Sequence, residues 1–203
     1  MKKLESTLTN MVVVLTAVAV VMGGVLAWVN HLTSGPINEQ KQQALQNGIK
    51  AVMQADGELA VTATDTIRQT DAKGKEQTFI VYHTEKGAAV ESTTLGFGGN
   101  LKVLVGFDAE GHILGYTLLE HQETPGLGAK ADQWFQKGQK GDIIGRNPAE
   151  GLIVTKDGGQ VDAITASTIT SRTFLLAVTN AYNAYQGKAA DGATGASKSL
   201  KTE

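Results

Sequence analysis

The stretch VDAITASTITSR, from Val161 to Arg172, marks the change from a short β-prone run to the longest helix expected outside the apolar N-terminal segment. Thr165, Ser167 and Thr168 lie at this change, where hydroxyl side chains commonly cap the N–H groups of a first helical turn. The apolar residues that follow recur three and four positions apart, which predicts one buried helical stripe. They are Phe174, Leu175, Val178, Ala181, Tyr182 and Tyr185.

Short β-prone runs alternate with turn residues over most of the chain before this stretch, which predicts a series of strands. Glu85-Lys86-Gly87 separates two of these runs, and Asp108 to Gly111 is the turn of a clear hairpin. A short helix that carries Trp134 and Phe135 is expected over residues 131–139. The strands are expected at residues 59–69, 77–82, 88–92, 101–107, 113–120 and 151–155.

A glycine loop, LGFGGN at residues 95–100, precedes the hairpin. It lacks the G-x-G-x-x-G spacing and no helix is expected after it, which excludes a dinucleotide-binding Rossmann loop. The glycines fit a tight entry into a strand. They also suit a backbone that approaches a flat ligand closely, and on that interpretation Gly96, Phe97, Gly98 and Gly99 are candidate binding residues.

The segment HQETPGLGAK, residues 121–130, follows the hairpin. Its Thr-Pro-Gly run is typical of a turn. His121 and Glu123 share one face of an extended strand end, so an acid–base pair is one interpretation. No nucleophile motif such as G-x-S-x-G accompanies them, which disfavours an independent hydrolase.

Three stretches in this order resemble the FMN-binding domain family. They are the Gly96–Gly99 loop, the E-T-P-G-L-G run at residues 123–128, and Asp162-x-x-Thr165-Ala166-Ser167-Thr168 followed by Thr170 and Ser171. The family pattern for the third is D-x-x-[ST]-G-A-T, so Ala166 stands in place of Gly and Ser167 in place of Ala. In that family a flavin transferase attaches FMN through a phosphoester to the last Thr, which is Thr168 here.

The resemblance therefore implies covalent FMN as the cofactor and a flavin transferase as a partner in maturation. The chemistry suits this role, because a hydroxyl can attack phosphorus and a helix N-terminus favours an anionic phosphodiester. The resemblance also implies an α+β fold, with a mainly antiparallel sheet and the helix over residues 168–186 packed on it. Candidate non-covalent contacts to the flavin are Gly96, Phe97, Gly98, Gly99, Glu123, Thr124, Pro125, Gly126, Leu127 and Gly128, with Leu127 packing on the ring.

The N-terminal run MVVVLTAVAVVMGGVLAWV, residues 11–29, carries no charge. It is long enough to cross a hydrocarbon layer of ~30 Å, which takes ~20 helical residues. Ala27-Trp28-Val29 is a poor cleavage site and the run exceeds a signal-peptide core, so an uncleaved anchor is favoured over a signal peptide. Lys2 and Lys3 then predict that residues 1–10 are cytoplasmic and that the domain lies outside the inner membrane, with 11–29 in contact with lipid.

Composition excludes several classes of function. The formal net charge is −2 without a dense basic run, which argues against nucleic acid as a partner. The chain has no Cys, which excludes disulfides, iron–sulfur clusters and thiolate metal sites. Its four His residues are scattered without H-x-x-x-H spacing, so no metal site is expected.

These patterns predict five segments: a cytoplasmic N-terminus at 1–10, a transmembrane anchor at 11–30, a membrane-proximal helix at 31–56, the FMN-binding domain at 57–186, and a tail at 187–203. Gly35-Pro36 is expected to end the anchor helix. The polar helix after it carries Ala44, Leu45, Ile49, Val52 and Met53 on one side. The tail is expected to be disordered because it has almost no apolar residue.

The tail contains a second copy of the motif. Asp191 to Ser197 reads DGATGAS, which matches the family letters more closely than residues 162–168 except for Ser at the acceptor position. No helix or core is expected after it, so we interpret this copy as compositional chance in an Ala/Gly/Ser tail. Thr168, and not Ser197, is the predicted attachment site.

With one N-terminal anchor and this length, the chain resembles the family of G subunits of the Rnf complex. That resemblance implies a membrane-anchored electron-transfer subunit of an ion-translocating ferredoxin:NAD+ oxidoreductase, with the other Rnf subunits as partners and no complete catalytic site of its own. The C subunit of the sodium-pumping NADH:quinone reductase has the same domain and modification but is usually longer, and it is the alternative. A flavin-free, membrane-anchored binding or assembly domain is the alternative from another class.

Overall fold

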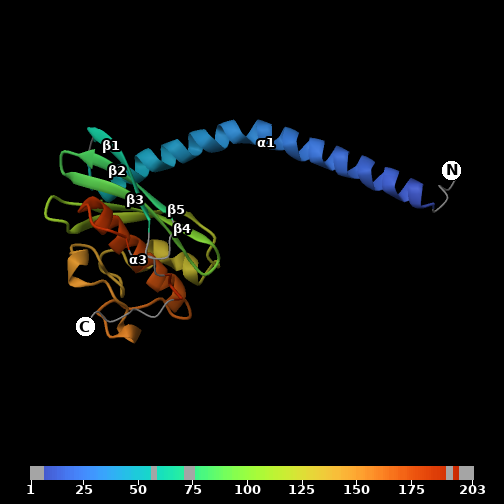
Figure 1. Cartoon of the computed structure of the whole chain (residues 1–203). Helices are drawn as coiled ribbons and strands as arrows, with labels where there is room; N and C mark the ends of the chain where they lie inside the picture. The colour runs from blue at the N-terminus through green and yellow to red at the C-terminus, as the bar shows by residue number, and fades with distance from the viewer. Residues whose placement is uncertain (1–6, 56–58, 71–75, 191–193, 197–203) are drawn as a thin grey trace. The chain divides into compact units, whose positions relative to one another are not determined.

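The computed structural model describes residues 7–55, 59–70, 76–190 and 194–196. The chain divides into two compact units, Met1–Ala44 and Leu45–Glu203. Helix α1 (Leu8–Val52) supplies the first unit and enters the second (Figure 1). The second unit contains the strands and the remaining helices: β1 (Ala63–Thr70), β2 (Glu76–Thr84), β3 (Gly87–Leu95), β4 (Asn100–Phe107), β5 (Ile113–His121), α2 (Ala131–Trp134), α3 (Thr168–Tyr185) and the 3-10 turns η1 (Gly128–Lys130), η2 (Pro148–Glu150) and η3 (Thr155–Asp157).

Among the described residues, α1 is the one helix long and apolar enough to cross a membrane. Its most apolar 18-residue window has a mean hydropathy of 2.6, and the side chains of that window are exposed in the isolated chain. The helix continues through Pro36, so the predicted end at Gly35-Pro36 is wrong. Proline removes one backbone hydrogen bond, but good helix formers such as Gln, Lys, Ala and Leu follow from Gln40 and carry the helix onward.

The five strands form one antiparallel sheet in the order β1-β2-β3-β4-β5, which confirms the predicted α+β class. Thr84 pairs with Gly87 across the predicted β2–β3 turn. The N–H of Gly111 donates to the carbonyl of Asp108 at 3.1 Å and closes the predicted β4–β5 turn. The strand expected at 151–155 is absent from this sheet, because that segment turns into η3 after a single bridge between Val154 and Val161.

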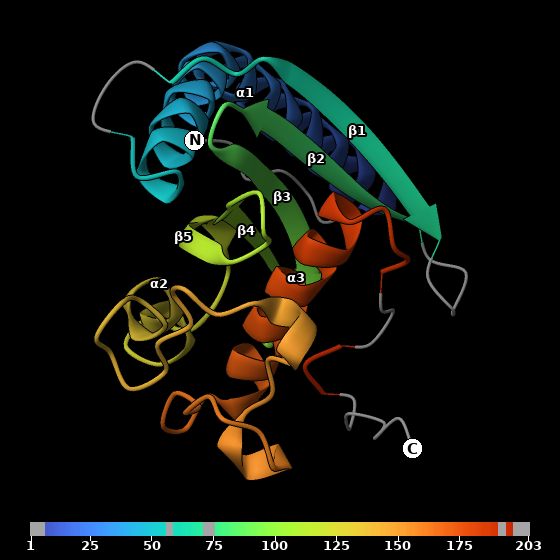
Figure 2. The same cartoon turned by 90° about the vertical axis from the view of Figure 1, so that its left-hand side faces the viewer.

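One face of the sheet is covered by α3, which lies across β3 and β4 (Figures 1 and 2). Alternate residues of β4, such as Val105 and Phe107, belong to the core on this face. Phe174 of α3 stacks on Phe135 with ring centroids 4.4 Å apart and meets the edge of Tyr116 at 4.7 Å. Complete burial of such a side chain stabilises the fold by roughly 1.5–3 kcal/mol, so the predicted apolar stripe holds α3 in place.

The other face of the sheet is covered by the last turns of α1. Ile49, Val52 and Met53 are buried there against Ala89 and Leu104. Gly106 of β4 pairs with Gly115 of β5 beneath the helix end, and a Cβ at Gly106 would lie 2.4 Å from the carbonyl oxygen of Val52. The second compact unit therefore begins at Leu45, and the start of the FMN-binding domain at residue 57 remains a prediction.

Part of the predicted tail is described and lies on the domain. Gln69 of β1 donates from Nε2 to the carbonyl of Lys188 at 2.8 Å and accepts from the N–H of Ala190 at 2.7 Å. A Cβ at Gly195 would lie 2.4 Å from the carbonyl oxygen of Ile169, so Gly195 lies against the start of α3. Residues 191–193 and 197–203, which include Ser197, lie outside the described residues, and the disorder predicted for the tail as a whole remains a prediction.

Candidate functional site

A cavity of about 320 Å³ lies at the N-terminal end of α3. Its lining comes from the three stretches that the sequence singles out, although Phe97 and Glu123 are 26 positions apart in the chain and Glu123 and Thr170 are 47 apart. The lining residues are Phe97, Glu123, Thr124, Leu127, Gly128, Ala166, Ser167, Thr168, Ile169 and Thr170. Three distant segments thus converge on one small-molecule-sized site.

Thr168 is the first residue of α3, and its side chain is half-buried in the cavity wall. Its Oγ1 accepts a hydrogen bond from Nζ of Lys156 at 3.1 Å. The first N–H groups of any α-helix have no acceptor within the helix, and Ser167 at the N-cap position provides no side-chain cap. The predicted hydroxyl capping by Ser167 is therefore wrong, and the helix end favours an anion from outside.

The turn before α3 explains Ser171, one of the two hydroxyl residues after the motif. The N–H of Ser167 donates to the carbonyl of Ile164 at 3.0 Å, with Ala166 at φ +61° inside this turn. Ser171 accepts at Oγ from the N–H of Ile164 at 2.9 Å and donates to the carbonyl of Ser167 at 3.0 Å. Ser171 therefore ties the turn to the helix, which holds the backbone of Thr168, the predicted attachment residue.

Glu123 connects the glycine loop to the same helix. Its Oε1 accepts from the N–H groups of Phe97 at 2.8 Å and Gly98 at 3.3 Å, and its Oε2 accepts from Oγ1 of Thr170 at 2.7 Å. The residue is only 5% exposed. His121, in contrast, is exposed at the end of β5. The carboxylate is occupied by these three donors, which leaves no support for an acid–base pair with His121.

The glycines of both loops allow this close packing around Glu123. A Cβ at Gly96 would lie 2.1 Å from Oε1 of Glu123, and one at Gly128 would lie 2.6 Å from Oε2. A Cβ at Gly98 would lie 2.1 Å from the carbonyl oxygen of Gln122. The close backbone approach expected of these glycines is thus an approach to the chain itself. Gly96, Gly98 and Gly99 do not line the cavity, and their contact with a flavin remains a prediction.

The tip of the second loop is exposed and does not line the cavity. The N–H of Leu127 donates to the carbonyl of Thr124 at 3.2 Å, which closes a turn with Pro125 and Gly126 in its centre. Gly126 has φ +76°, as the third position of a type II turn requires, and a Cβ there would meet nothing within 4 Å. Pro125 and Gly126 are exposed and shape the turn, while Thr124 and Leu127 line the cavity.

Besides the buried Ser171, two exposed residues of the predicted motif lie outside the cavity lining. Asp162 and Thr165 are both exposed. The backbone carbonyl of Asp162 accepts a hydrogen bond from Nε1 of Trp134 at 2.8 Å, which fixes the start of the motif on the α2 region. The side chains of Asp162 and Thr165 are thus accessible to another protein, as recognition by a transferase would need.

Two residues at the site carry no sequence signal of their own. Ile169 lines the cavity, and Lys156 reaches Thr168 from a loop 12 residues earlier. Asp157, next to Lys156, binds Arg172 of α3 through two hydrogen bonds of 2.7 Å and 2.6 Å. The hydrogen bonds from Arg172 hold the pKa of the Asp157 carboxyl below its usual value. These contacts arise from the path of an irregular loop, which no periodic pattern predicts.

Asp108, Glu110 and His112 form another cluster, with ligand-type atoms within 4.8 Å of one another. Oδ1 of Asp108 accepts from the N–H of His112 at 2.7 Å, and Oδ2 lies 3.1 Å from Nδ1 of the same residue. These contacts close the β4–β5 turn, so the closeness of Asp108 and His112 has a structural explanation. The absence of a metal site remains a prediction.

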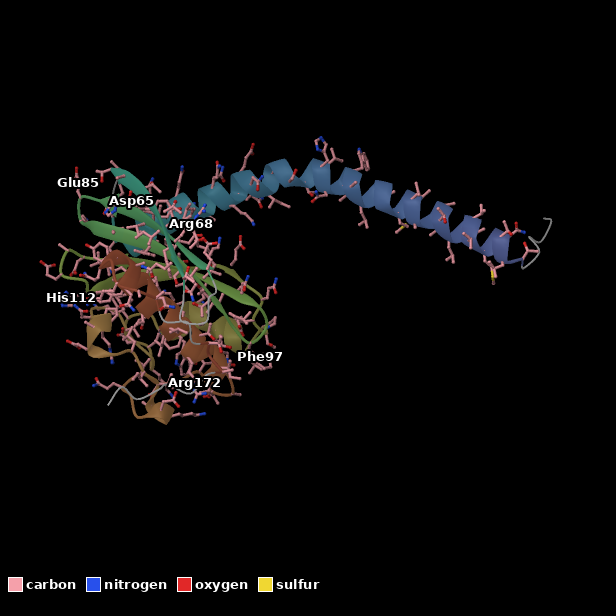
Figure 3. All side chains as sticks on the ribbon, viewed as in Figure 1. Asp65, Arg68, Glu85, Phe97, His112 and Arg172 are labelled. Atoms are coloured by element: carbon pink, nitrogen blue, oxygen red, sulfur yellow. The ribbon has the colours of Figure 1, made fainter. Side chains whose placement is uncertain are left out.

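The cavity fits a ligand with a flat apolar part and an anionic end. Its volume of about 320 Å³ lies at the lower end of small-molecule pockets, about 300–1,000 Å³. Phe97, which is 69% exposed (Figure 3), and Leu127, which is 41% exposed, offer apolar surface at its edge. The Thr168 hydroxyl and the N-terminus of α3 form the polar end. FMN has these two parts, an aromatic ring system and an anionic phosphate.

Comparison with known proteins also indicates an FMN-binding domain. The profile described as "FMN-binding domain" matches residues 96–183, and the profile described as "RnfG N-terminal region" matches residues 1–52. The chain is 34% identical over 176 residues to the G subunit of the ion-translocating oxidoreductase complex of Shewanella baltica, which covers 80% of this chain and 82% of the relative. It is 33% identical over 189 residues to the corresponding protein of Aliivibrio fischeri, with 87% and 89% covered. The Vibrio cholerae relative of the same name is 33% identical over 181 residues, with 83% and 85% covered. The chain therefore belongs to the family of G subunits of ion-translocating oxidoreductase complexes and contains an FMN-binding domain.

Proposed function

We propose that this chain is the membrane-anchored electron-transfer subunit of an ion-translocating ferredoxin:NAD+ oxidoreductase, and that it carries FMN in phosphoester linkage to Thr168. The observation that carries the proposal is the convergence of the Thr168 hydroxyl, the glycine loop and the Glu123–Gly128 loop on one cavity. The names of the relatives and the match to the RnfG N-terminal region favour this complex over the sodium-pumping quinone reductase.

The residues of the chain hold and orient the cofactor. Thr168 supplies the oxygen of the phosphoester, and the N-terminus of α3 supplies N–H donors and a positive dipole end to the phosphate. Phe97, Leu127 and Ile169 offer apolar surface to the ring system. Bound FMN supplies one- and two-electron redox chemistry, and the protein supplies its position and electrostatic surroundings.

The second motif copy at 191–197 is the competing attachment site. Ser197 lies outside the described residues. Thr168 is favoured because it lies at the start of an 18-residue helix beside a cavity. A flavin attached there would have a fixed position, which electron transfer between fixed partners needs. The proposal accordingly assigns no flavin to Ser197.

Peptide mass mapping after co-expression with a flavin transferase tests this assignment. The wild-type chain should carry the FMN mass on the peptide that contains Thr168. Thr168→Ala should abolish this mass, whereas Ser197→Ala should retain it. FMN that persists on Thr168→Ala would move the attachment to the tail, and a colourless wild-type protein would favour a flavin-free binding or assembly domain.

A further inference from the structure

We propose that Lys156 is the cation that binds the phosphate group of FMN at Thr168. This inference rests on the proposed function, since it concerns the phosphate of the attached cofactor. The contact that motivates it is the hydrogen bond from Nζ of Lys156 to Oγ1 of Thr168 at 3.1 Å. That oxygen is the atom that joins protein and phosphorus in the proposed linkage.

The position of the ammonium matches the place of the phosphate. A phosphorus atom bonded to Oγ1 of Thr168 places its two charged oxygens next to the atom that Lys156 already contacts. A Lys ammonium has three donors, and Thr168 takes one of them in the structure. Lys binds phosphate as a mobile point charge, so a small movement of Nζ is enough to move the hydrogen bond from Oγ1 to a phosphate oxygen.

The backbone of Lys156 is held in place although its side chain is exposed. The N–H of Thr155 donates to the carbonyl of Val161 at 2.9 Å, and Gly158 at φ +86° ends the η3 turn. The bidentate pair of Asp157 with Arg172 ties the turn to α3. Arg172 lies four residues after Thr168, one helical turn along α3. These contacts tie the loop that carries Lys156 to the helix that carries Thr168.

Charge also singles out Lys156 near this end of α3. The guanidinium of Arg172 is committed to Asp157 at 2.6 Å and 2.7 Å. Within the described parts of the chain, Lys156 takes part in none of the ion pairs with a carboxylate. Its charge is thus available to a phosphodiester, and an anion bound there would be shared between Lys156 and the helix N-terminus.

Amine labelling of the full chain in detergent tests this contact directly. The wild-type chain flavinylated by co-expression and the same chain expressed without a flavin transferase are treated briefly with an acylating reagent, and each Lys is scored by peptide mass spectrometry. We expect acylation of Lys156 to fall several-fold in the flavinylated chain, because an ammonium bound to phosphate is less nucleophilic and less accessible. Lys137 and Lys140, which are exposed on the loop after α2, are the controls and should label equally in both proteins.

The outcomes separate the inference from the function on which it rests. Equal labelling of Lys156 in both proteins, with the FMN mass present on Thr168, would overturn the role of Lys156 and leave the proposed function intact. Absence of the FMN mass from the Thr168 peptide would overturn the proposed function and this inference together.

A second measurement follows the mobility of the attached flavin. In Lys156→Met the phosphate loses a partner, so the fast component of the flavin fluorescence anisotropy decay should grow, and Lys156→Arg should restore the slower decay. Lys140→Met is the matched control and should behave as wild type. A decay in Lys156→Met equal to that of the control would contradict the proposal.

Discussion

Ala166 occupies a backbone conformation that usually belongs to glycine. Its φ of +61° costs an L-residue roughly 1–2 kcal/mol. The turn from Ile164 to Ser167 needs a positive φ at this position, which is a physical reason for Gly in the family pattern. The chain keeps the turn in spite of the Cβ, because Ser171 holds both of its ends.

Ala166→Gly should therefore stabilise the protein. Gly relieves the strain of the left-handed conformation at this position. This gain exceeds the cost of the greater conformational entropy of Gly in the unfolded chain, which is about 0.4–1 kcal/mol. We therefore expect the free energy of unfolding to rise by about 0.5–1 kcal/mol. Urea denaturation of the purified chain measures it. Ala177→Gly in the middle of α3 is the control and should cost about 1 kcal/mol. A loss in both variants would contradict the argument about Ala166.

Glu123 also has a structural role, which its position in a binding motif does not predict. Its carboxylate joins the glycine loop to α3 through Phe97, Gly98 and Thr170. Hydrogen bonds to a charged group contribute about 1.5–3 kcal/mol each to stability. The two walls of the cavity are thus held at a fixed spacing by one side chain.

Glu123→Gln should lower the free energy of unfolding by about 1–3 kcal/mol, because the amide loses the charge and turns a donor toward Oγ1 of Thr170. It should also reduce flavin incorporation on Thr168, measured by intact mass after co-expression. Glu85→Gln, in the exposed β2–β3 turn (Figure 3), is the control and should change stability by less than about 0.5 kcal/mol. Wild-type stability and incorporation in Glu123→Gln would show that the link is dispensable.

Among the elements, η3 and α3 are coupled through Asp157 and Arg172. The hydrogen bonds from Arg172 lower the pKa of Asp157 from its ordinary value of 3.8. A carboxyl whose pKa is lower in the folded state stabilises the fold above its unfolded pKa. That stability is lost as the pH falls through the folded pKa, so the link is complete at neutral pH and weakens only below about pH 4.

Asp157→Asn should consequently be less stable than wild type at pH 7 and at pH 5. The difference between the two proteins should shrink as the pH falls below about 4, where wild-type Asp157 also becomes neutral. Urea midpoints of both proteins between pH 7 and pH 3 measure this difference. A difference that is the same at every pH would mean that the Asp157 charge contributes nothing to the link.

The elements differ in how well the sequence predicts them. Alternating apolar residues and short turns predict the paired strands, and the apolar stripe predicts α3, because burial on one face leaves a regular period. The prediction that the anchor helix ends at Gly35-Pro36 is wrong, because a long helix tolerates the loss of one backbone hydrogen bond. The segment at 151–155 misleads as well, because a β-prone run without a neighbouring strand to pair with becomes a turn.

At the scale of the whole molecule, the sequence indicates which segments line the cavity but not the contacts between them. Phe97, Leu127 and Thr168 meet at the cavity as the motifs suggest. The hydrogen bonds of Glu123 to the glycine loop and of Lys156 to Thr168 are not predictable from the motifs. They depend on irregular loops whose paths are set by tertiary packing. Pairings over such distances leave no periodic trace in one sequence.

The charges at the N-terminus predict the orientation of the chain in the membrane. Lys2 and Lys3 precede the apolar part of α1, so by the positive-inside rule we predict that they lie in the cytoplasm. With one span, the domain is then predicted to lie on the outer side. The orientation is testable with little interference, because the chain contains no Cys.

Two single-cysteine variants, Lys3→Cys and Lys137→Cys, should respond oppositely to a membrane-impermeant maleimide. Lys137 is exposed in the domain, so its Cys should label in intact spheroplasts, and the Cys at position 3 should label only after lysis. The cysteine-free wild type is the control. Labelling only after lysis at position 137, together with labelling of intact cells at position 3, would reverse the topology. Loss of the position-3 peptide from the mature protein would instead indicate that a signal peptide had been cleaved, because an uncleaved anchor retains it.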